Sequence, residues 1–202
     1  MSPSNRKKMF TLAWDVDDVL NNLMRVWLEA WWLPQHPGCM LNYEDIKKNP
    51  PHKLLGVDLD EYLQSLDEFR LSGHYEQMQP NIKALEWFEK YGSSFRHITV
   101  TSAPRIAASV SASWVIRHFG DWIRTFHFVP SLRRGEILPE YDTTKAACLS
   151  WVNSVDILIE DNEKNVTGLT KMGIQYFIVR RPWNSSLLKM EDLLNNLSQH
   201  LS

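Results

Sequence analysis

Three carboxylates lie close together near the start of the chain. Asp15, Asp17 and Asp18 come directly after the apolar run of residues 9–14. Carboxylates at the end of a buried strand contribute nothing to packing, and without partners they repel one another, which costs stability. A bound cation or a charge-compensated ligand removes that repulsion. The spacing therefore indicates a functional site at this point rather than a structural one.

A second acidic pair follows another apolar run. Glu160 and Asp161 come at the end of residues 155–160, which read VDILIE. In an open α/β sheet, ligands bind beyond the carboxyl ends of the strands. Two acidic strand ends that meet there form an oxygen-rich site, which suits a hard cation such as Mg²⁺.

Hydroxyl groups and a lysine complete this candidate site. Thr101 and Ser102 follow the apolar run of residues 96–100, and they offer hydroxyls and backbone N–H groups. Lys145 lies in the first turn of a predicted helix and supplies a positive charge. Carboxylates, a cation, hydroxyls and a lysine together indicate a site that binds a phosphate group.

The elements that position these side chains are strands that alternate with helices. This alternation predicts an α/β fold with a Rossmann-like parallel sheet covered by helices on both faces. Apolar runs predict the strands and 3.6-residue periodicity predicts the helices. The expected strands are residues 9–15, 96–101, 124–129, 155–160 and 174–179, and the expected helices are residues 80–92, 104–120, 145–152 and 162–173.

The segment after the first strand breaks the alternation. Apolar residues from Leu20 to Trp31 recur at helical spacing, and Pro34 is expected to end that helix. Residues 42–51 and 58–73 predict two further helices, and no strand is evident. We therefore expect a small helical cap of residues 19–80, inserted into a core domain of residues 1–18 and 81–202.

Composition excludes several classes of protein. The formal net charge of −2 does not fit a protein that coats duplex nucleic acid. Two cysteines, Cys39 and Cys148, cannot form a disulfide framework, which fits a reducing compartment. No window approaches the roughly 20 apolar residues that cross a bilayer. We expect a cytoplasmic protein that does not bind membranes.

Four segments in order resemble the motifs of the haloacid dehalogenase superfamily. The run from Asp15 to Leu20, DVDDVL, is similar to the D-x-D-x-[TV] signature after the first strand. Thr101 resembles the second motif, Lys145 the third, and the pair Glu160-Asp161 the acidic fourth. Each motif alone is common, but all four in this order span residues 9–180.

Within that superfamily the chain is most similar to the 5′(3′)-deoxyribonucleotidases. The opening motif leads into an apolar cap helix, residues 101–104 read TSAP, and residues 180–184 read RRPWN, as in relatives of that family. Two departures stand out. Asp18 replaces the usual glycine, and Glu160 stands where that family has aspartate.

The resemblance implies a Mg²⁺-dependent phosphomonoesterase. In that chemistry Asp15 attacks phosphorus and forms an aspartyl-phosphate, and Asp17 is the general acid and base. The cation is held by the Asp15 carboxylate, the Asp17 backbone carbonyl and Asp161, with Glu160 as a further ligand or a supporting group. The phosphate is held by Thr101, Ser102 and Lys145.

Three functions stay open at this point. The resemblance favours a 5′-nucleotidase that acts on (deoxy)nucleoside monophosphates. A phosphatase of a sugar phosphate or another small metabolite uses the same chemistry, and a non-catalytic binding protein uses the same fold. In the cap, Trp27 and Trp31 either stack on a substrate base or belong to the core of the cap. Arg133 and Arg134 are predicted to form a solvated turn.

Overall fold

The computed structural model describes residues 9–152 and 154–200. Its centre is a sheet in which every paired strand is parallel to its neighbour, in the order β3-β2-β1-β4-β5. The predicted α/β fold with a parallel sheet is confirmed. The strands are β1 (Thr11–Trp14), β2 (Arg96–Ala103), β3 (Ile123–Pro130), β4 (Ile157–Glu160) and β5 (Gln175–Ile178).

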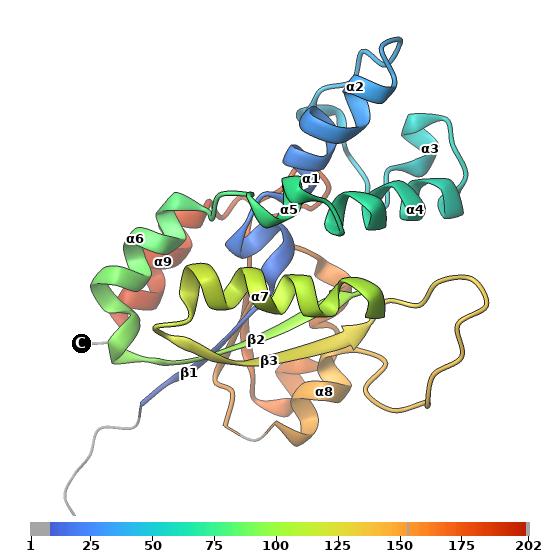
Figure 1. Cartoon of the computed structure of the whole chain (residues 1–202). Helices are drawn as coiled ribbons and strands as arrows, with labels where there is room; N and C mark the ends of the chain where they lie inside the picture. Colours follow the sequence, from blue (N-terminus) through green and yellow to red (C-terminus); the bar gives the residue numbers. More distant parts are fainter. Residues whose placement is uncertain (1–8, 153, 201–202) are drawn as a thin grey trace, which may run out of the picture.

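Helices cover both faces of the sheet (Figure 1). Alternate residues of β1 point to opposite faces, so that Trp14 and Ala13 belong to different apolar clusters. On the first face Trp14 packs against Phe88, with ring centroids 5.0 Å apart. That face carries α6 (Ile82–Tyr91), α7 (Ala108–Phe119) and α9 (Met190–Gln199), and the other carries α8 (Lys145–Trp151).

A group of short helices stands over the carboxyl end of the sheet, as predicted for the cap (Figure 1). Its first helix continues through a π-helical segment and ends at Gln35 rather than at Pro34, because proline is tolerated in the first turn of α2. The cap elements are α1 (Leu23–Trp27), a π-helical segment (Leu28–Trp32), α2 (Leu33–Gln35), a 3₁₀ turn (Tyr43–Asp45), α3 (His52–Leu55), α4 (Leu59–Arg70) and α5 (Gly73–Glu76).

Two predicted helices are shorter in the structure than the sequence indicated. Residues 42–51 form only the 3₁₀ turn Tyr43–Asp45. Residues 162–173 form two 3₁₀ turns, Glu163–Val166 and Leu169–Met172, which Gly168 separates. Gly168 has a φ of 89°, a left-handed conformation that ends a helical turn and suits glycine.

The chain passes between core and cap at two adjacent connections. The backbone N–H of Asn81 donates a hydrogen bond to the carbonyl of Leu20, at 2.7 Å. This hydrogen bond fits boundaries between core and cap at residues 18/19 and 80/81. The two boundaries stay a prediction. None of the helices in the described part of the chain has both the length and the apolarity that a membrane span requires.

Candidate active site

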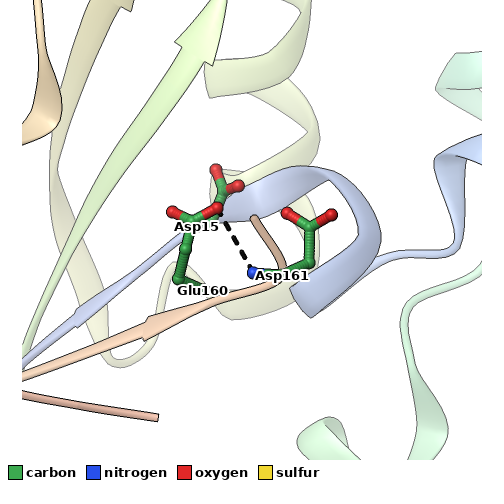
Figure 2. Close-up of side chains that lie close together, drawn as sticks. All are labelled: Asp15, Glu160 and Asp161. Carbon is green, nitrogen blue, oxygen red and sulfur yellow. Dashed lines mark hydrogen bonds between the residues drawn. The ribbon is translucent and has the colours of Figure 1, made fainter. Parts of the chain in front are cut away.

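Three buried carboxylates meet where β1 and β4 end (Figure 2). Asp15 follows β1, Glu160 is the last residue of β4, and Asp161 follows it. Because β1 and β4 are hydrogen-bonded neighbours, their carboxyl ends bring these side chains together. One carboxylate oxygen from each lies within 4.8 Å of the others. The predicted meeting of the two acidic strand ends is therefore present.

Burial and mutual repulsion make this cluster a strong acceptor of positive charge. Burial, followed by the charge of Glu160, raises the pKa of Asp15 to about 7. Burial, followed by the charge of Asp15, raises the pKa of Asp161 to about 7. A hard divalent cation favours several carboxylate oxygens at short range, and its charge offsets their repulsion. The residues present thus fit a site for Mg²⁺.

Lys145 binds two of the three carboxylates. Its Nζ atom lies 2.9 Å from Oδ1 of Asp15 and 2.5 Å from Oε2 of Glu160. Burial alone lowers the pKa of Lys145, but the charges of the two carboxylates outweigh that effect and raise it. Thr144 caps α8 by accepting a hydrogen bond from the Ala147 N–H, which fixes Lys145 in the first turn.

Glu160 and Asp161 differ in their partners. Both oxygens of Glu160 are occupied, Oε2 by Lys145 and Oε1 by two backbone N–H groups and the amide of Asn165. Asp161 accepts one side-chain hydrogen bond, from the indole N–H of Trp183 at 2.8 Å, and lines the cavity described below. Asp161 is therefore the more accessible of the two to a cation, and Glu160 orients Lys145.

A cavity of about 290 Å³ separates the carboxylate cluster from the cap. Its wall on the core side is polar and its wall on the cap side is mixed. Core residues that line it are Asp15, Asp17, Asp18, Ser102, Ser131, Arg133, Asp161, Asn162 and Asn165, and cap residues include Leu23, Met24, Asn49, Tyr62, Leu66 and Arg70.

Asp17 faces this cavity and has three buried partners. Arg70 from α4 donates to its Oδ2 from Nε and Nη2, at 3.3 and 3.1 Å. The Tyr75 hydroxyl and the Asn21 amide donate to its Oδ1, at 3.2 and 3.0 Å. No motif in the sequence marks Arg70, Tyr75 or Asn21 as partners of Asp17. Only Asn21, four residues after Asp17, carried a local signal.

The two hydroxyl residues occupy different places. Strand β2 extends to Ala103, so both lie within it rather than after it. Thr101 is buried, and its hydroxyl forms a hydrogen bond with Asp15. Ser102 lines the cavity. The structure thus brings Thr101 to the Asp15 carboxylate and Ser102 to the space where a ligand would lie.

The cap tryptophans do not line the cavity, and of the two alternatives for Trp27 and Trp31 this placement favours the core of the cap. Trp27 is fully buried, packs edge-on against Tyr62 at 5.3 Å, and donates its indole N–H to Ser65. Trp31 packs against Phe69. Both belong to the aromatic core of the cap, because bulky side chains at helical spacing fill the space between α1 and α4.

Arg133 is also placed differently from the prediction of a solvated turn. Its Nε and Nη2 atoms lie 2.5 and 2.7 Å from the carboxylate of Asp67 in α4. Asp67 also accepts a hydrogen bond from Arg70, at 3.3 Å. Asp17, Arg70, Asp67 and Arg133 therefore form a continuous chain of ion pairs between core and cap. Arg134, in contrast, is exposed as predicted.

Asp18 adopts a left-handed conformation. Its φ is 61°, and its carboxylate accepts a hydrogen bond from the backbone N–H of Met24, at 3.1 Å. Its carbonyl accepts from Nε of Arg181, at 2.7 Å. Burial raises the pKa of Asp18 to about 7, and the charge of Arg181 opposes that shift.

Comparison with known proteins gives a match in structure but not in sequence. No protein-family model and no curated protein matches this sequence. A haloacid dehalogenase-like family hydrolase from Streptococcus pneumoniae superposes with a TM-score of 0.65 at 13% identity, covering 96% of this chain and 99% of the other. A protein from Clostridium acetobutylicum described as a predicted phosphatase gives 0.60 at 13% identity, covering 96% and 100%.

A third similar structure is described as bound to magnesium. It is a haloacid dehalogenase hydrolase from Bacillus subtilis, with a TM-score of 0.59 at 14% identity, covering 97% of this chain and 100% of the other. Similarity at this level of identity concerns the fold, and it extends over nearly the whole of each chain. The protein has the fold of the haloacid dehalogenase hydrolases.

Proposed function

We propose that the protein is a Mg²⁺-dependent phosphomonoesterase. The observation that carries the proposal is the buried cluster of Asp15, Glu160 and Asp161, with Lys145 bound to Asp15 at 2.9 Å. Such a cluster is costly to fold, and a cation together with a phosphate group offsets that cost. The similar structures described as a predicted phosphatase and as a magnesium-bound hydrolase support the same chemistry.

Asp15 is proposed as the nucleophile. Its carboxylate oxygen forms a bond to phosphorus, and the bond from phosphorus to the leaving alkoxide oxygen breaks. Asp17, which faces the same cavity, would donate the proton to that leaving oxygen in a state in which Arg70 has left its Oδ2 and a proton has taken that place. Water then attacks the aspartyl-phosphate, Asp17 accepts the proton from the water, and inorganic phosphate leaves. Thr101, Ser102 and Lys145 stabilise the charge on the phosphoryl oxygens.

The cation would be held by Asp15, Asp161 and the backbone carbonyl of Asp17. When bound, it neutralises charge between the nucleophile and the phosphate. Glu160 is proposed as a positioning residue, since its two oxygens already hold Lys145 and the turn that follows β4.

The proposed substrate is a small phosphorylated metabolite, with a (deoxy)nucleoside monophosphate as the first candidate from the sequence resemblance. One observation favours the alternative of a sugar phosphate or a similar compound. The cavity is about 290 Å³, at the small end of the ~300–1,000 Å³ usual for ligand sites.

The test is an assay of the purified protein on an aryl phosphate, after removal of metal and with increasing Mg²⁺. We expect turnover that depends on Mg²⁺ and disappears in EDTA. Nucleoside monophosphates and sugar phosphates are then compared by kcat/KM to identify the substrate class. Full activity without metal, or equal activity in Asp15→Asn, would contradict the mechanism. No turnover on any phosphate ester would favour the non-catalytic binding protein.

A further inference from the structure

A second cavity, of about 450 Å³, lies beside the catalytic one and shares no lining residue with it. Its walls come from α1, from residues 43–47 and from the segment between β5 and α9. That second segment contains the RRPWN run, which the proposed function does not use. The charged residues that line the cavity are Arg25, Lys47, Arg180, Arg181 and Lys189, with Glu44 as the one carboxylate.

Most of this positive charge is uncompensated. Arg25 pairs with Glu44 at 3.4 Å and with Glu29 at 3.5 Å. The side chains of Lys47, Arg180 and Lys189 form no hydrogen bond or ion pair with any residue in the described part of the chain. In a protein whose net charge is −2, such a concentration of cations around one cavity attracts anions.

Arg181 adds a buried donor that lacks an acceptor. Its Nε donates to the carbonyl of Asp18, and its Nη1 donates to the carbonyl of Arg180 at 3.2 Å. Its Nη2 is buried and has no hydrogen-bond partner among the described residues. Nη2 has almost no accessible surface, so Arg181 contributes its positive charge to the cavity wall while the exposed cations beside it are the groups that an anion would contact.

We propose that this cavity is a binding site for a small polyphosphate anion, such as the di- or triphosphate group of a nucleotide. Several cations around a volume within the ~300–1,000 Å³ range of ligand sites suit a compact, multiply charged group. Guanidinium groups bind phosphate oxygens through two parallel hydrogen bonds, and lysines add point charges. The site is independent of the proposed catalytic function.

The site is connected to the catalytic residues through the backbone. Arg181 donates to the carbonyl of Asp18, and Asn184, also at the cavity wall, donates to the carbonyl of Asp161, at 2.7 Å. An anion that binds Arg181 therefore acts on the turn at Asp18, and one that binds Asn184 acts on the turn at Asp161. Binding in the cavity is expected to change the affinity of the carboxylate cluster for Mg²⁺, and the reverse by linkage.

The test is calorimetric titration of the metal-free protein with inorganic tripolyphosphate at low salt. We expect one site per chain, and binding that weakens as salt is added. The double substitution Arg180→Gln/Lys189→Gln changes two exposed side chains and should weaken binding about tenfold or more. The control Lys164→Gln/Lys171→Gln removes the same charge elsewhere on the surface and should leave binding unchanged.

Four results would overturn the proposal. Equal weakening in both double variants would show attraction to net charge rather than a site. A loss of binding in Asp15→Asn would place the anion in the catalytic cavity. No saturable binding of tripolyphosphate, or much tighter binding of a single-stranded RNA oligonucleotide, would mean that the cavity is not a small-anion site. Each of these results is a measurement of binding, so none depends on phosphatase activity.

Discussion

The buried acids of the catalytic site cost the protein stability when no cation is bound. The pKa values of Asp15, Asp18 and Asp161 are each raised to about 7, with burial as the largest cause. A carboxyl group with a raised native pKa stabilises the fold fully only below its unfolded value near 4, and that contribution is lost as the pH rises through about 7. At pH 8 these three side chains are charged and work against folding.

Asp15→Asn should therefore separate activity from stability. Without the nucleophile, turnover should fall on the order of 10⁴-fold or more. In metal-free buffer at pH 8 the Tm should rise by about 2–4 °C, which corresponds to roughly 1 kcal/mol for a chain of this size. At pH 5 the gain should vanish, because the native carboxyl is then protonated. Scanning calorimetry at both pH values, with exposed Asp121→Asn as control, measures this.

Trp183→Phe tests the proposed role of Asp161 as a ligand. The indole N–H of Trp183 holds one oxygen of Asp161, at 2.8 Å. Loss of a hydrogen bond to a metal ligand typically weakens metal binding 10–100-fold. We expect this decrease in Mg²⁺ affinity in Trp183→Phe when the dependence of Tm on Mg²⁺ concentration is measured. Trp151→Phe removes a similar bond, to Asp142 at 2.9 Å away from the cluster, and should leave the affinity unchanged.

Among the elements, the turn from Asp15 to Asn21 determines the geometry of the site. It leaves β1, passes through the left-handed Asp18, and begins the cap at α1. The Asp18 carboxylate accepts a hydrogen bond from the Met24 N–H, so the residue in the left-handed conformation also satisfies a backbone donor in the first turn of α1. At Asp18 the left-handed backbone therefore lowers the stability of the folded protein, and the hydrogen bond from the Met24 N–H raises it.

Substitutions at Asp18 should separate these effects. Asp18→Asn keeps the acceptor, tolerates the left-handed conformation and removes a charge, so it should raise the free energy of unfolding at pH 8. Asp18→Ala loses the capping bond, at a cost of about 1 kcal/mol, and adds a left-handed penalty of ~1–2 kcal/mol. Urea unfolding of both variants in EDTA measures the difference. A change of the same sign in the free energy of unfolding of both variants would contradict the roles assigned to the charge and to the capping bond.

Local patterns predicted most of these elements, and distance along the chain limited the rest. The strands and α6, α7 and α8 follow from apolar runs and periodicity, and so does the meeting of Asp15 with Asp161. Arg70 and Tyr75 lie 53 and 58 residues from Asp17 along the chain, and no local pattern pairs them with it. The two 3₁₀ turns after Asp161 were missed because one glycine interrupts an otherwise helical pattern.

On the scale of the whole molecule, ion pairs hold the cap against the core at the cavity. Asp67 in α4 binds Arg133 of the core, and its neighbour Arg70 binds Asp17. Asp17, Asp67 and Arg70 are buried. Breaking a buried ion pair by removing one partner costs about 3–5 kcal/mol, because the other charge stays buried and unpaired.

Asp67→Asn should therefore loosen α4 and lower stability by about that amount. Hydrogen exchange of the Leu59–Arg70 amides should become faster, while the β1 and β4 amides keep their relative protection. The matched control is Asp60→Asn in the same helix, whose partner Arg134 is exposed and lies 3.5 Å away. Equal exchange in the two variants would show that the Asp67 pairs do not hold the cap.

The connections at Leu20 and Asn81 place both crossings of the chain between cap and core next to each other. Because the chain crosses between the two parts at neighbouring points joined by one backbone hydrogen bond, rotation about that line leaves both connections unstretched. Any swing that lifts α4 from the sheet edge also separates Arg70 from Asp17. An opening of the cavity by such a rotation would therefore break the ion pair of Asp17 with Arg70 and leave the proposed general acid without its positive partner.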